Sequence, residues 1–478
     1  MAFAYDQVLY NSQPMAQTHP DHVAALAILF GMSPAPVERC RVLELGCGNG
    51  ANLIPMALAL PESRFAGVDL AEAPIRMAQA LAEELRLRNC AFHHLDLTEL
   101  TAAFGEFDYI IAHGVYSWVP PGTRDKLLAV CRSLLAPSGV AYVSYNTYPG
   151  CHLRNIARDM MLYQTRGITD PELRLKDAAA LVRFLASAEP ASPALREELR
   201  VVESRDPSVL FHDDLAEVNQ PVYFHQFIEH AREHGLDFLA EAQFSAMQEA
   251  AFSAETAETV RLLAQGDRIR KQQYLDFLKC RRFRQTLLCH RETRLEDPPN
   301  AQHARRLWAA SAAAPVSDEE FRSPEGASIR TNLPAVKSAI AYLGRSWPRA
   351  VSFDELASEV GPSGSEILPD LLLRSCASGL VELHAMPSPF SVEVSERPRA
   401  FALARLQAAS GATVTTLRHS DDEIQDRLAR ELIRLLDGTR DRAALLRDLQ
   451  PFAGAEPLRL EDLERNLAKL ARRALLEA

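Results

Sequence analysis

The residues with the clearest chemical meaning in this sequence are glycines that follow an apolar segment. They lie in the run Val42-Leu43-Glu44-Leu45-Gly46-Cys47-Gly48-Asn49-Gly50-Ala51. Glycines allow positive φ angles and a close approach of the backbone to a ligand. The N-terminus of a helix that begins there offers free N–H groups to an anionic group. The spacing Gly46-x-Gly48-x-x-Ala51 also satisfies the dinucleotide fingerprint, so the run alone does not identify the ligand.

Three acidic residues separate the two interpretations. Glu44 stands two residues before the first glycine, where enzymes that bind S-adenosylmethionine (SAM) commonly carry an acid. Asp69 and Asp96 each end a predicted strand, at the edge where open α/β sheets bind ligands. The first can accept both ribose hydroxyls and the second the exocyclic amine of adenine. A NAD site leaves Asp96 without a role, so the set favours SAM as the cofactor.

The predicted cofactor site extends from these acids to their neighbours. Tyrosines near the N-terminus can fold over the carboxylate of the cofactor. We predict as cofactor-binding residues Tyr10, Glu44, Gly46, Cys47, Gly48, Asn49, Gly50, Asp69, Leu70, Asp96, Leu97 and His113.

A second group of aromatic and polar residues follows the fourth and fifth predicted strands. Methyl transfer is an in-line displacement that needs a positioned, neutral nucleophile and exclusion of water. Aromatic rings suit a cationic amine and a sulfonium through cation–π attraction. The candidate catalytic residues here are Tyr116, Trp118, Asn146 and Tyr148. A packed aromatic cluster between two parts of the chain is the structural alternative.

Histidines offer further candidates. His19 precedes Pro20 and is either a base near neutral pH or a local cap of the helix that begins there. His225, His230 and His234 could suggest metal ligands, but interleaved glutamates favour a solvated helix face. The cysteines form no C-x-x-C pair, so we predict no metal site. The basic run Lys279–Arg284 is expected to form structural ion pairs.

Alternating strands and helices must position these residues, as in a parallel α/β sheet. A helix over Pro20–Phe30 precedes the sheet, a polar helical insertion covers about 152–210, and two late strands complete seven. The predicted strands are Arg41–Leu45, Arg64–Asp69, Ala91–Leu95, Phe107–Ala112, Val140–Tyr145, Leu236–Phe244 and Arg284–Cys289.

The C-terminal part is predicted to be mostly helical. Three helices over Pro334–Leu343, Phe353–Val360 and Glu366–Ser378, followed by a hairpin around Met386–Pro389, suggest a winged-helix unit. The expected fold is therefore a class I, Rossmann-like, seven-stranded methyltransferase core with a winged-helix-like C-terminal domain. We expect a cap at 1–38, a core at 39–292 whose residues from about 211 form a regulatory segment, and a C-terminal domain at 293–478.

Charge and hydropathy limit the partners. The formal net charge of −11 disfavours nucleic acid and anionic membrane surfaces, and is compatible with a cationic acceptor such as protein lysine. The sequence contains no apolar stretch long enough to span a bilayer and no signal-peptide pattern at its first residues. A cytoplasmic location is expected; oligomeric state is not predicted.

Several motifs recur together along nearly the whole chain. They are Tyr5-Asp6, Tyr10, Ser12, Thr18-His19-Pro20, Phe30-Gly31-Met32, Leu43–Gly50, His113–Val119, Tyr145–Gly150, Gln272–Leu278, Arg281–Leu288 and Leu436–Asp441. In this combination the chain resembles the bacterial methyltransferases that carry a methyltransferase regulatory domain, including rickettsial-type protein lysine methyltransferases. The resemblance implies a SAM-binding core, a middle segment that shapes substrate access and a C-terminal winged helix.

Three functions remain open from the sequence. The first is methylation of an amine, with protein lysine side chains as the acceptor. The second is methylation of a small molecule, and the third is a SAM-binding sensor or scaffold without turnover. The intact set of Gly46, Gly48, Asp69 and Asp96 makes the third the least favoured.

Overall fold

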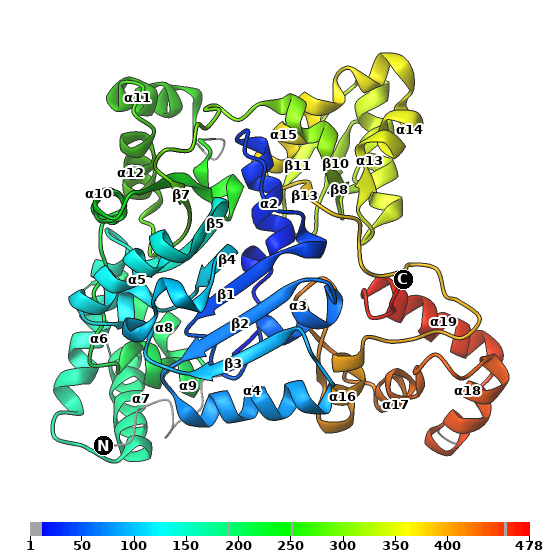
Figure 1. Ribbon diagram of the computed structural model, residues 1–478, viewed down its shortest axis with the longest axis horizontal. Coiled ribbons are helices and arrows are strands. Elements are labelled where there is room, and N and C mark those ends of the chain that lie inside the picture. The colour runs from blue at the N-terminus through cyan, green and yellow to red at the C-terminus, as the bar shows by residue number, and fades with distance from the viewer. Residues whose placement is uncertain (1–11, 189–191, 250–251, 454–456) are drawn as a thin grey trace.

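A seven-stranded sheet forms the centre of the molecule (Figure 1). The computed structural model describes residues 12–188, 192–249, 252–453 and 457–478. The strand order is β3-β2-β1-β4-β5-β7-β6, in which the first five strands are parallel and β7 runs antiparallel to both of its neighbours. The predicted seven-stranded class I core is confirmed. The sheet strands are β1 (Arg41–Leu45), β2 (Arg64–Asp69), β3 (Cys90–His94), β4 (Phe107–Ala112), β5 (Leu135–Asn146), β6 (Leu236–Glu241) and β7 (Phe283–His290).

The central strands are apolar because helices cover them. Every residue of β4 is buried, as expected for a parallel strand enclosed on both faces. The helix predicted ahead of the sheet is α2, and its residues from Val23 to Leu29 are buried all round rather than on one face. The helices of this part are α2 (Pro20–Leu29), α3 (Leu53–Ala59), α4 (Glu72–Glu84), α5 (Pro121–Leu134), α10 (Phe224–Glu233), α11 (Ala254–Ala264) and α12 (Arg268–Lys279).

The predicted helical insertion is present and has a small core of its own. It consists of α6 (Cys151–Gln164), α7 (Pro171–Ser187), α8 (Pro193–Glu203) and α9 (Pro207–Val209), at the lower left of Figure 1. Ala157, Met161, Ala178, Val182 and Leu199 pack together there, apart from the main core. The insertion therefore has a hydrophobic core separate from that of the sheet.

The basic run Lys279–Arg284, which leads into β7, forms ion pairs, as predicted. Arg284 is fully buried; its Nη2 lies 2.8 Å from Asp276 Oδ1 and its Nη1 lies 3.4 Å from Glu241 Oε1. Arg281 contacts the same two carboxylates. The run is therefore a structural element of the core, because buried charges must be paired.

The strand arrangement of the C-terminal part differs from the one that the sequence predicted. The three predicted helices are α13 (Pro334–Ser346), α14 (Phe353–Ser365) and α15 (Leu368–Ala377), but no hairpin forms around Met386–Pro389 in the part of the chain that the structure describes. Instead β13 (Glu382–His384) pairs with β8 (Trp308–Ala310), which precedes the helices and also pairs with β12 (Val351–Ser352). The prolines had suggested a turn, whereas the partner strand lies about 70 residues earlier.

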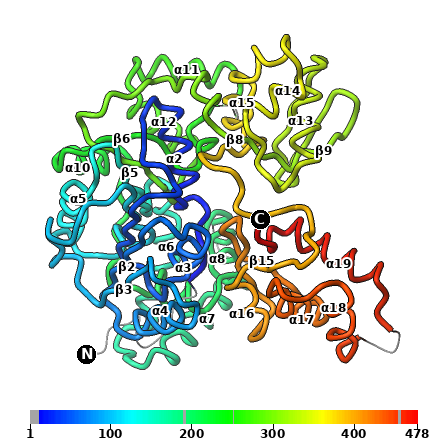
Figure 2. Tube along the Cα trace, turned by 45° about the vertical axis from the view of Figure 1, so that its right-hand side comes forward, coloured from blue at the N-terminus to red at the C-terminus, as the bar shows by residue number. Residues whose placement is uncertain are grey.

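The last residues form a second helical group, which Figure 2 shows below the first. The first group consists of α13, α14 and α15 with the sheet of β8, β12 and β13. It also contains a small sheet of β9 (Ala314–Pro315), β10 (Glu320–Arg322) and β11 (Ser328–Arg330). The second group contains α16 (Ala402–Ser410), β14 (Thr413–Thr415), β15 (Asp421–Glu423), α17 (Arg427–Leu435), α18 (Arg442–Leu449) and α19 (Leu460–Arg472).

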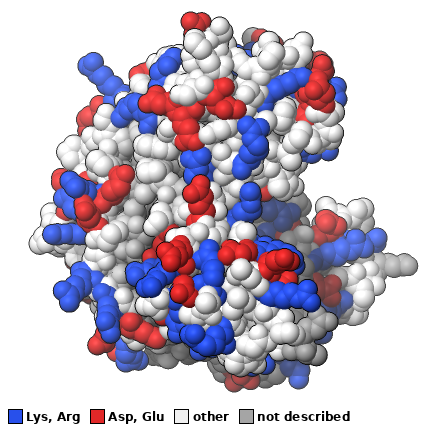
Figure 3. Space-filling view, turned by 90° about the vertical axis from the view of Figure 1, so that its right-hand side faces the viewer, with Lys and Arg blue, Asp and Glu red and all other residues white. Residues whose placement is uncertain are grey.

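The surface of this side of the molecule mixes both signs of charge. Figure 3 shows Lys and Arg interspersed with Asp and Glu, with no continuous area of one sign. Among the described residues, no helix combines the length and apolar character that crossing a bilayer requires.

Candidate active site

The glycine loop after β1 has the conformation that its sequence predicts. Gly46, Gly48 and Gly50 have φ angles of 77°, 52° and 77°, in the left-handed region that favours glycine. A Cβ atom at Gly46 would lie 2.6 Å from Val115 Cγ2, and one at Gly50 would lie 2.8 Å from the Phe92 ring. The loop is thus fixed both by backbone angle and by close packing. The Asn49 side chain accepts a hydrogen bond from Ala51 N at 3.2 Å, which stabilises the turn into α3.

Glu44 is the buried acid of the site. Its Oε1 accepts a hydrogen bond from Asn52 Nδ2 at 2.8 Å, while its Oε2 is buried and finds no partner among the described residues. Burial raises the pKa of Glu44 to about 8, because the carboxylate loses its hydration, with a smaller contribution from Asp69. A cation placed next to Oε2 would satisfy this oxygen and restore the charged form.

A residue that the sequence analysis missed, Asn52, connects Glu44 to distant parts of the chain. Its Oδ1 accepts a hydrogen bond from Met15 N at 2.9 Å and lies 2.7 Å from His419 Nε2. Thr18 Oγ1 lies 3.0 Å from Asn52 Nδ2. Asn52 lies eight residues after Glu44, where its side chain could have been predicted to meet the acid, but nothing in the sequence links either residue to His419.

The two acids at the ends of β2 and β3 lie at the same edge of the sheet. Asp69 Oδ2 accepts a hydrogen bond from Gly48 N at 2.8 Å, and Oδ1 accepts one from Ala71 N at the same distance. Asp69 therefore fixes the glycine loop directly. Asp96 Oδ1 accepts hydrogen bonds from the backbone and hydroxyl of Thr98, both at 2.8 Å. Leu70, directly after β2, is 45% exposed.

Cys47, Leu97 and His113 complete the predicted set that the structure describes. Cys47 is buried beneath the loop, and a Cβ at Gly67 would meet its sulfur at 2.7 Å. Leu97 is partly buried beside Asp96. His113 Nδ1 lies 3.0 Å from the Tyr142 hydroxyl, and burial lowers the pKa of His113 to about 4. Tyr10 lies outside the described residues.

Two of the aromatic candidates have clear packing partners. Tyr116 is 2% exposed, and its ring contacts Tyr145 and Phe227 with centroid distances of 5.8 and 5.0 Å. Trp118 is partly buried under the Arg154 guanidinium, 5.9 Å from the ring centroid. Packing against Tyr145 and Phe227 accounts for the position of Tyr116, so this ring belongs to a packed aromatic cluster, the structural alternative given above. A catalytic role for either residue stays a prediction.

Asn146 and Tyr148 differ in their access to solvent. Asn146 is buried; its backbone N donates to Ser117 Oγ at 2.8 Å, and its Nδ2 donates to Asn219 Oδ1 at 3.1 Å. Tyr148 is partly exposed and stacks on His152 with a centroid distance of 4.0 Å. Tyr223 lies 5.3 Å from the Tyr148 ring. We call Tyr148, His152 and Tyr223 the ring cluster; it follows the carboxyl end of β5.

His19 has the structural role that the sequence allowed. Its Nδ1 accepts a hydrogen bond from Asp21 N at 3.2 Å and caps the N-terminus of α2. Its ring lies 5.2 Å from that of His419. Burial lowers the pKa of His19 to about 4. The cap accounts for this side chain, so the structure gives no support to the catalytic alternative.

These residues fit SAM on observations of the structure itself. The glycine cradle admits a ligand close to the backbone, and Glu44 Oε2 is a buried oxygen without a partner among the described residues. An exposed Leu70 beside Asp69 and Asp96 suits an apolar base that carries polar edges. The set thus combines a site for an ammonium group, a site for hydroxyls and an apolar face.

Comparison with known families agrees with this site. Residues 42–139 match the family described as "Methyltransferase domain", residues 206–290 match "Predicted methyltransferase regulatory domain", and residues 396–476 match "PKMT, C-terminal winged helix domain". The winged helix thus falls on the second helical group, later in the chain than the sequence analysis placed it. The fold and the site define a class I SAM-dependent methyltransferase.

Relatives over the full length of the chain identify the family. The chain is 32% identical over 471 residues to an uncharacterized protein of Rickettsia prowazekii, covering 92% of this chain and 84% of that protein. The structure of PKMT2 from Rickettsia typhi matches with a TM-score of 0.84 and 26% identity, covering 98% of this chain and 99% of that one. The same protein in complex with AdoHcy matches with a TM-score of 0.83 and 25% identity, over the same shares. The chain belongs to the rickettsial-type family of SAM-dependent methyltransferases.

Proposed function

We propose that this protein transfers the methyl group of SAM to lysine side chains of another protein. The observation that carries the proposal is the likeness to PKMT2 of Rickettsia typhi over nearly all of both chains. The abbreviation PKMT denotes a protein lysine methyltransferase. A likeness of this extent includes the insertion and both C-terminal groups, which a shared methyltransferase core alone would not explain.

In this proposal the residues around the glycine loop bind the cofactor. Glu44 Oε2 pairs with the ammonium group of the methionine part, and Asp69 accepts the ribose hydroxyls while it fixes Gly48. Asp96 accepts from the adenine amine, and Leu70 covers the base. Bound SAM supplies a methyl group on a sulfonium, which a neutral amine can displace.

The ring cluster supports an amine acceptor. Tyr148, His152 and Tyr223 present partly exposed aromatic faces after β5, next to Asn146. Such faces attract ammonium groups and pack against the apolar stem of a lysine. In the transfer the amine nitrogen forms a bond to the methyl carbon as the carbon–sulfur bond breaks, and the methylated ammonium then loses a proton. Apolar surroundings favour the neutral amine that must attack.

Labelled SAM and total bacterial protein test the acceptor class. The proposal expects label in polypeptides, and mass spectrometry of the labelled bands should place it on lysine. Label only in the low-mass fraction would refute the proposal in favour of a small-molecule acceptor. SAM binding without any transfer would favour a sensor or scaffold instead.

A matched pair of variants tests the ring cluster. Tyr148→Ala should raise the KM for the labelled protein while SAM affinity stays unchanged, because the ring contacts the acceptor and not the cofactor. Tyr163→Ala serves as the control, since Tyr163 is 73% exposed on α6 and lies outside the cluster. Equal KM values for Tyr148→Ala and the wild type would show that the ring cluster does not bind the acceptor.

A further inference from the structure

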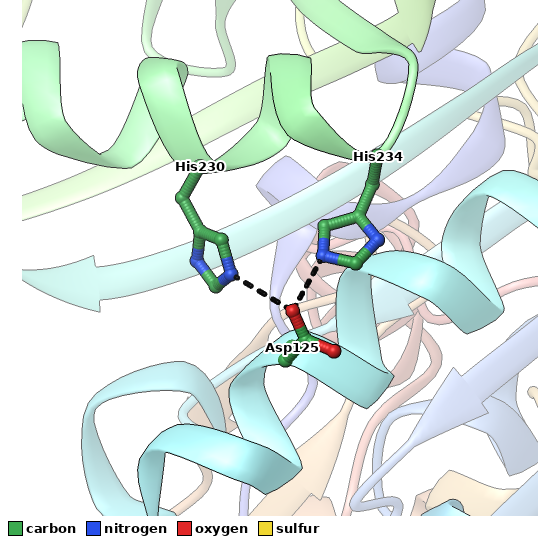
Figure 4. A group of neighbouring side chains, drawn as sticks. All are labelled: Asp125, His230 and His234. Atoms are coloured by element: carbon green, nitrogen blue, oxygen red, sulfur yellow. Dashed lines mark hydrogen bonds and ion pairs between the residues drawn. The ribbon is translucent and has the colours of Figure 1, made fainter.

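Away from the glycine loop, helices α5 and α10 bring together three side chains that could bind a metal ion. Figure 4 shows the imidazole rings of His230, on α10, and of His234, which directly follows that helix, directed at the carboxylate of Asp125 on α5. His234 Nε2 lies 2.9 Å from Asp125 Oδ1, and His230 Nε2 lies 3.7 Å from the same oxygen. One ligand atom from each residue lies within 4.8 Å of the other two. The glutamates interleaved with these histidines in the sequence favoured a solvated face, and Asp125, the third member of the cluster, lies more than 100 residues earlier.

The spacing matches that of a transition-metal site. Zinc binds histidine nitrogen and carboxylate oxygen at roughly 2.0–2.2 Å, so two tetrahedral ligands lie about 3.3 Å apart. The two observed separations, 2.9 and 3.7 Å, lie on either side of that value. Shifts of a few tenths of an ångström in these side chains would make the two nitrogen–oxygen separations equal. Two histidines one helical turn apart and one carboxylate leave further coordination positions to solvent.

A hydrogen bond behind the cluster supports the same interpretation. His230 Nδ1 lies 2.9 Å from the Tyr116 hydroxyl. A metal-binding histidine almost always donates its second ring N–H to an oxygen, which fixes the tautomer that presents the other nitrogen to the metal. Glu233 adds negative charge nearby, and Arg124 faces the Tyr116 ring.

We propose that Asp125, His230 and His234 bind one divalent transition-metal ion of the zinc or cobalt type. The ion ties α10 to α5 and, through His230, holds Tyr116 in place in the segment that follows β4. This inference does not depend on the proposed acceptor, because metal binding is measured without SAM or substrate.

Cobalt titration of the untagged, chelator-treated, full-length protein tests the site. One equivalent of Co²⁺ should bind and give a visible d–d spectrum without the charge-transfer band that a thiolate ligand would add. Zn²⁺ should then displace it. His234→Ala and Asp125→Asn should each weaken Co²⁺ binding by at least about tenfold. His225→Ala is the matched control, because His225 lies on the same helix but pairs with Gln273 at 2.9 Å.

Each result decides the proposal. Loss of binding in both site variants, with binding retained in His225→Ala, supports it. Tyr116→Phe should also weaken binding, by about tenfold or more, because it removes the oxygen behind His230. Equal binding in wild type and site variants, or a thiolate band, would assign the metal elsewhere and overturn the proposal. No binding to folded wild type would leave Asp125 as an ion-pair partner of the two histidines, and would overturn it as well.

Discussion

The ionisation of Glu44 should make SAM binding depend on pH. Burial raises the pKa of Glu44 to about 8 in the protein without ligand, whereas an ammonium group at Oε2 requires the carboxylate. Below pH 8, binding must therefore release the proton of Glu44. One pKa unit corresponds to about 1.4 kcal/mol, so affinity should fall about tenfold for each unit of pH below 8.

Between pH 7.5 and pH 6 the dissociation constant of SAM should thus rise about 25-fold, because the ionised fraction of Glu44 falls by that factor. The ammonium group of the ligand, with a pKa of about 7.7–8.0, stays largely charged in that range, so its own titration contributes little. Calorimetry in two buffers of different ionisation enthalpy should detect about one proton released per SAM bound at the lower pH. In Glu44→Gln the slope and the proton release should both vanish.

Glu44→Gln is a suitable comparison because its side-chain oxygen can still accept the hydrogen bond from Asn52. A second consequence concerns stability. Because the folded pKa lies above the ordinary value of 4.5, the ionisation of Glu44 should lower the stability of the protein without ligand as pH rises from 4.5 through 8, and this contribution should be absent from the variant. A pH-independent affinity in the wild type, or an equal slope in the variant, would refute the pairing of Glu44 with the ammonium group.

Three further predictions concern contacts between distant segments. His419→Ala removes the hydrogen bond to Asn52, which is worth about 1 kcal/mol, and should therefore weaken SAM binding about fivefold. Calorimetry measures this affinity. An unchanged affinity would mean that His419 connects the two segments without supporting the cofactor site. Burial opposes the charge of His384, but Asp21 and Glu382 outweigh it and raise its pKa to about 9. Its stabilising effect should be complete below pH 6.5 and disappear as pH rises through 9; urea unfolding should show that loss in the wild type and not in Asp21→Asn. Arg284→Met should lower the free energy of unfolding by about 3–5 kcal/mol, because two buried carboxylates lose one of their two cations and keep only Arg281, whereas the exposed Arg261→Met should change it by less than about 1 kcal/mol.

The sequence predicted the part of the site whose signals are local. The bounds of β1, β2 and β4 follow from apolar runs, and β1 ends directly before Gly46 while β2 ends at Asp69. The positive φ angles of Gly46, Gly48 and Gly50 follow from their residue type. The edge where Asp69 and Asp96 meet follows from parallel topology, because the carboxyl ends of such strands share one edge. These features depend on residues within a few positions of one another, so a single sequence contains them.

Pairings between distant segments could not be read in that way. The hairpin predicted at Met386–Pro389 was wrong, because β13 pairs with β8. Prolines indicate a local tendency to turn, but they do not indicate which distant strand will be the partner. The same holds for Asn52 with His419 and for Asp125 with His230 and His234.

The sequence by itself determined the cofactor loop, the seven-stranded core and the class of enzyme, since backbone conformation and strand burial set them locally. Only the tertiary structure decided which side chains meet across the fold. It showed that His19 caps a helix, that Tyr116 is packed among other rings, and that Glu44 is buried with one oxygen unpartnered among the described residues. The physical reason is that hydrogen bonds and charge pairs depend on distance in space, which folding sets for residues hundreds of positions apart.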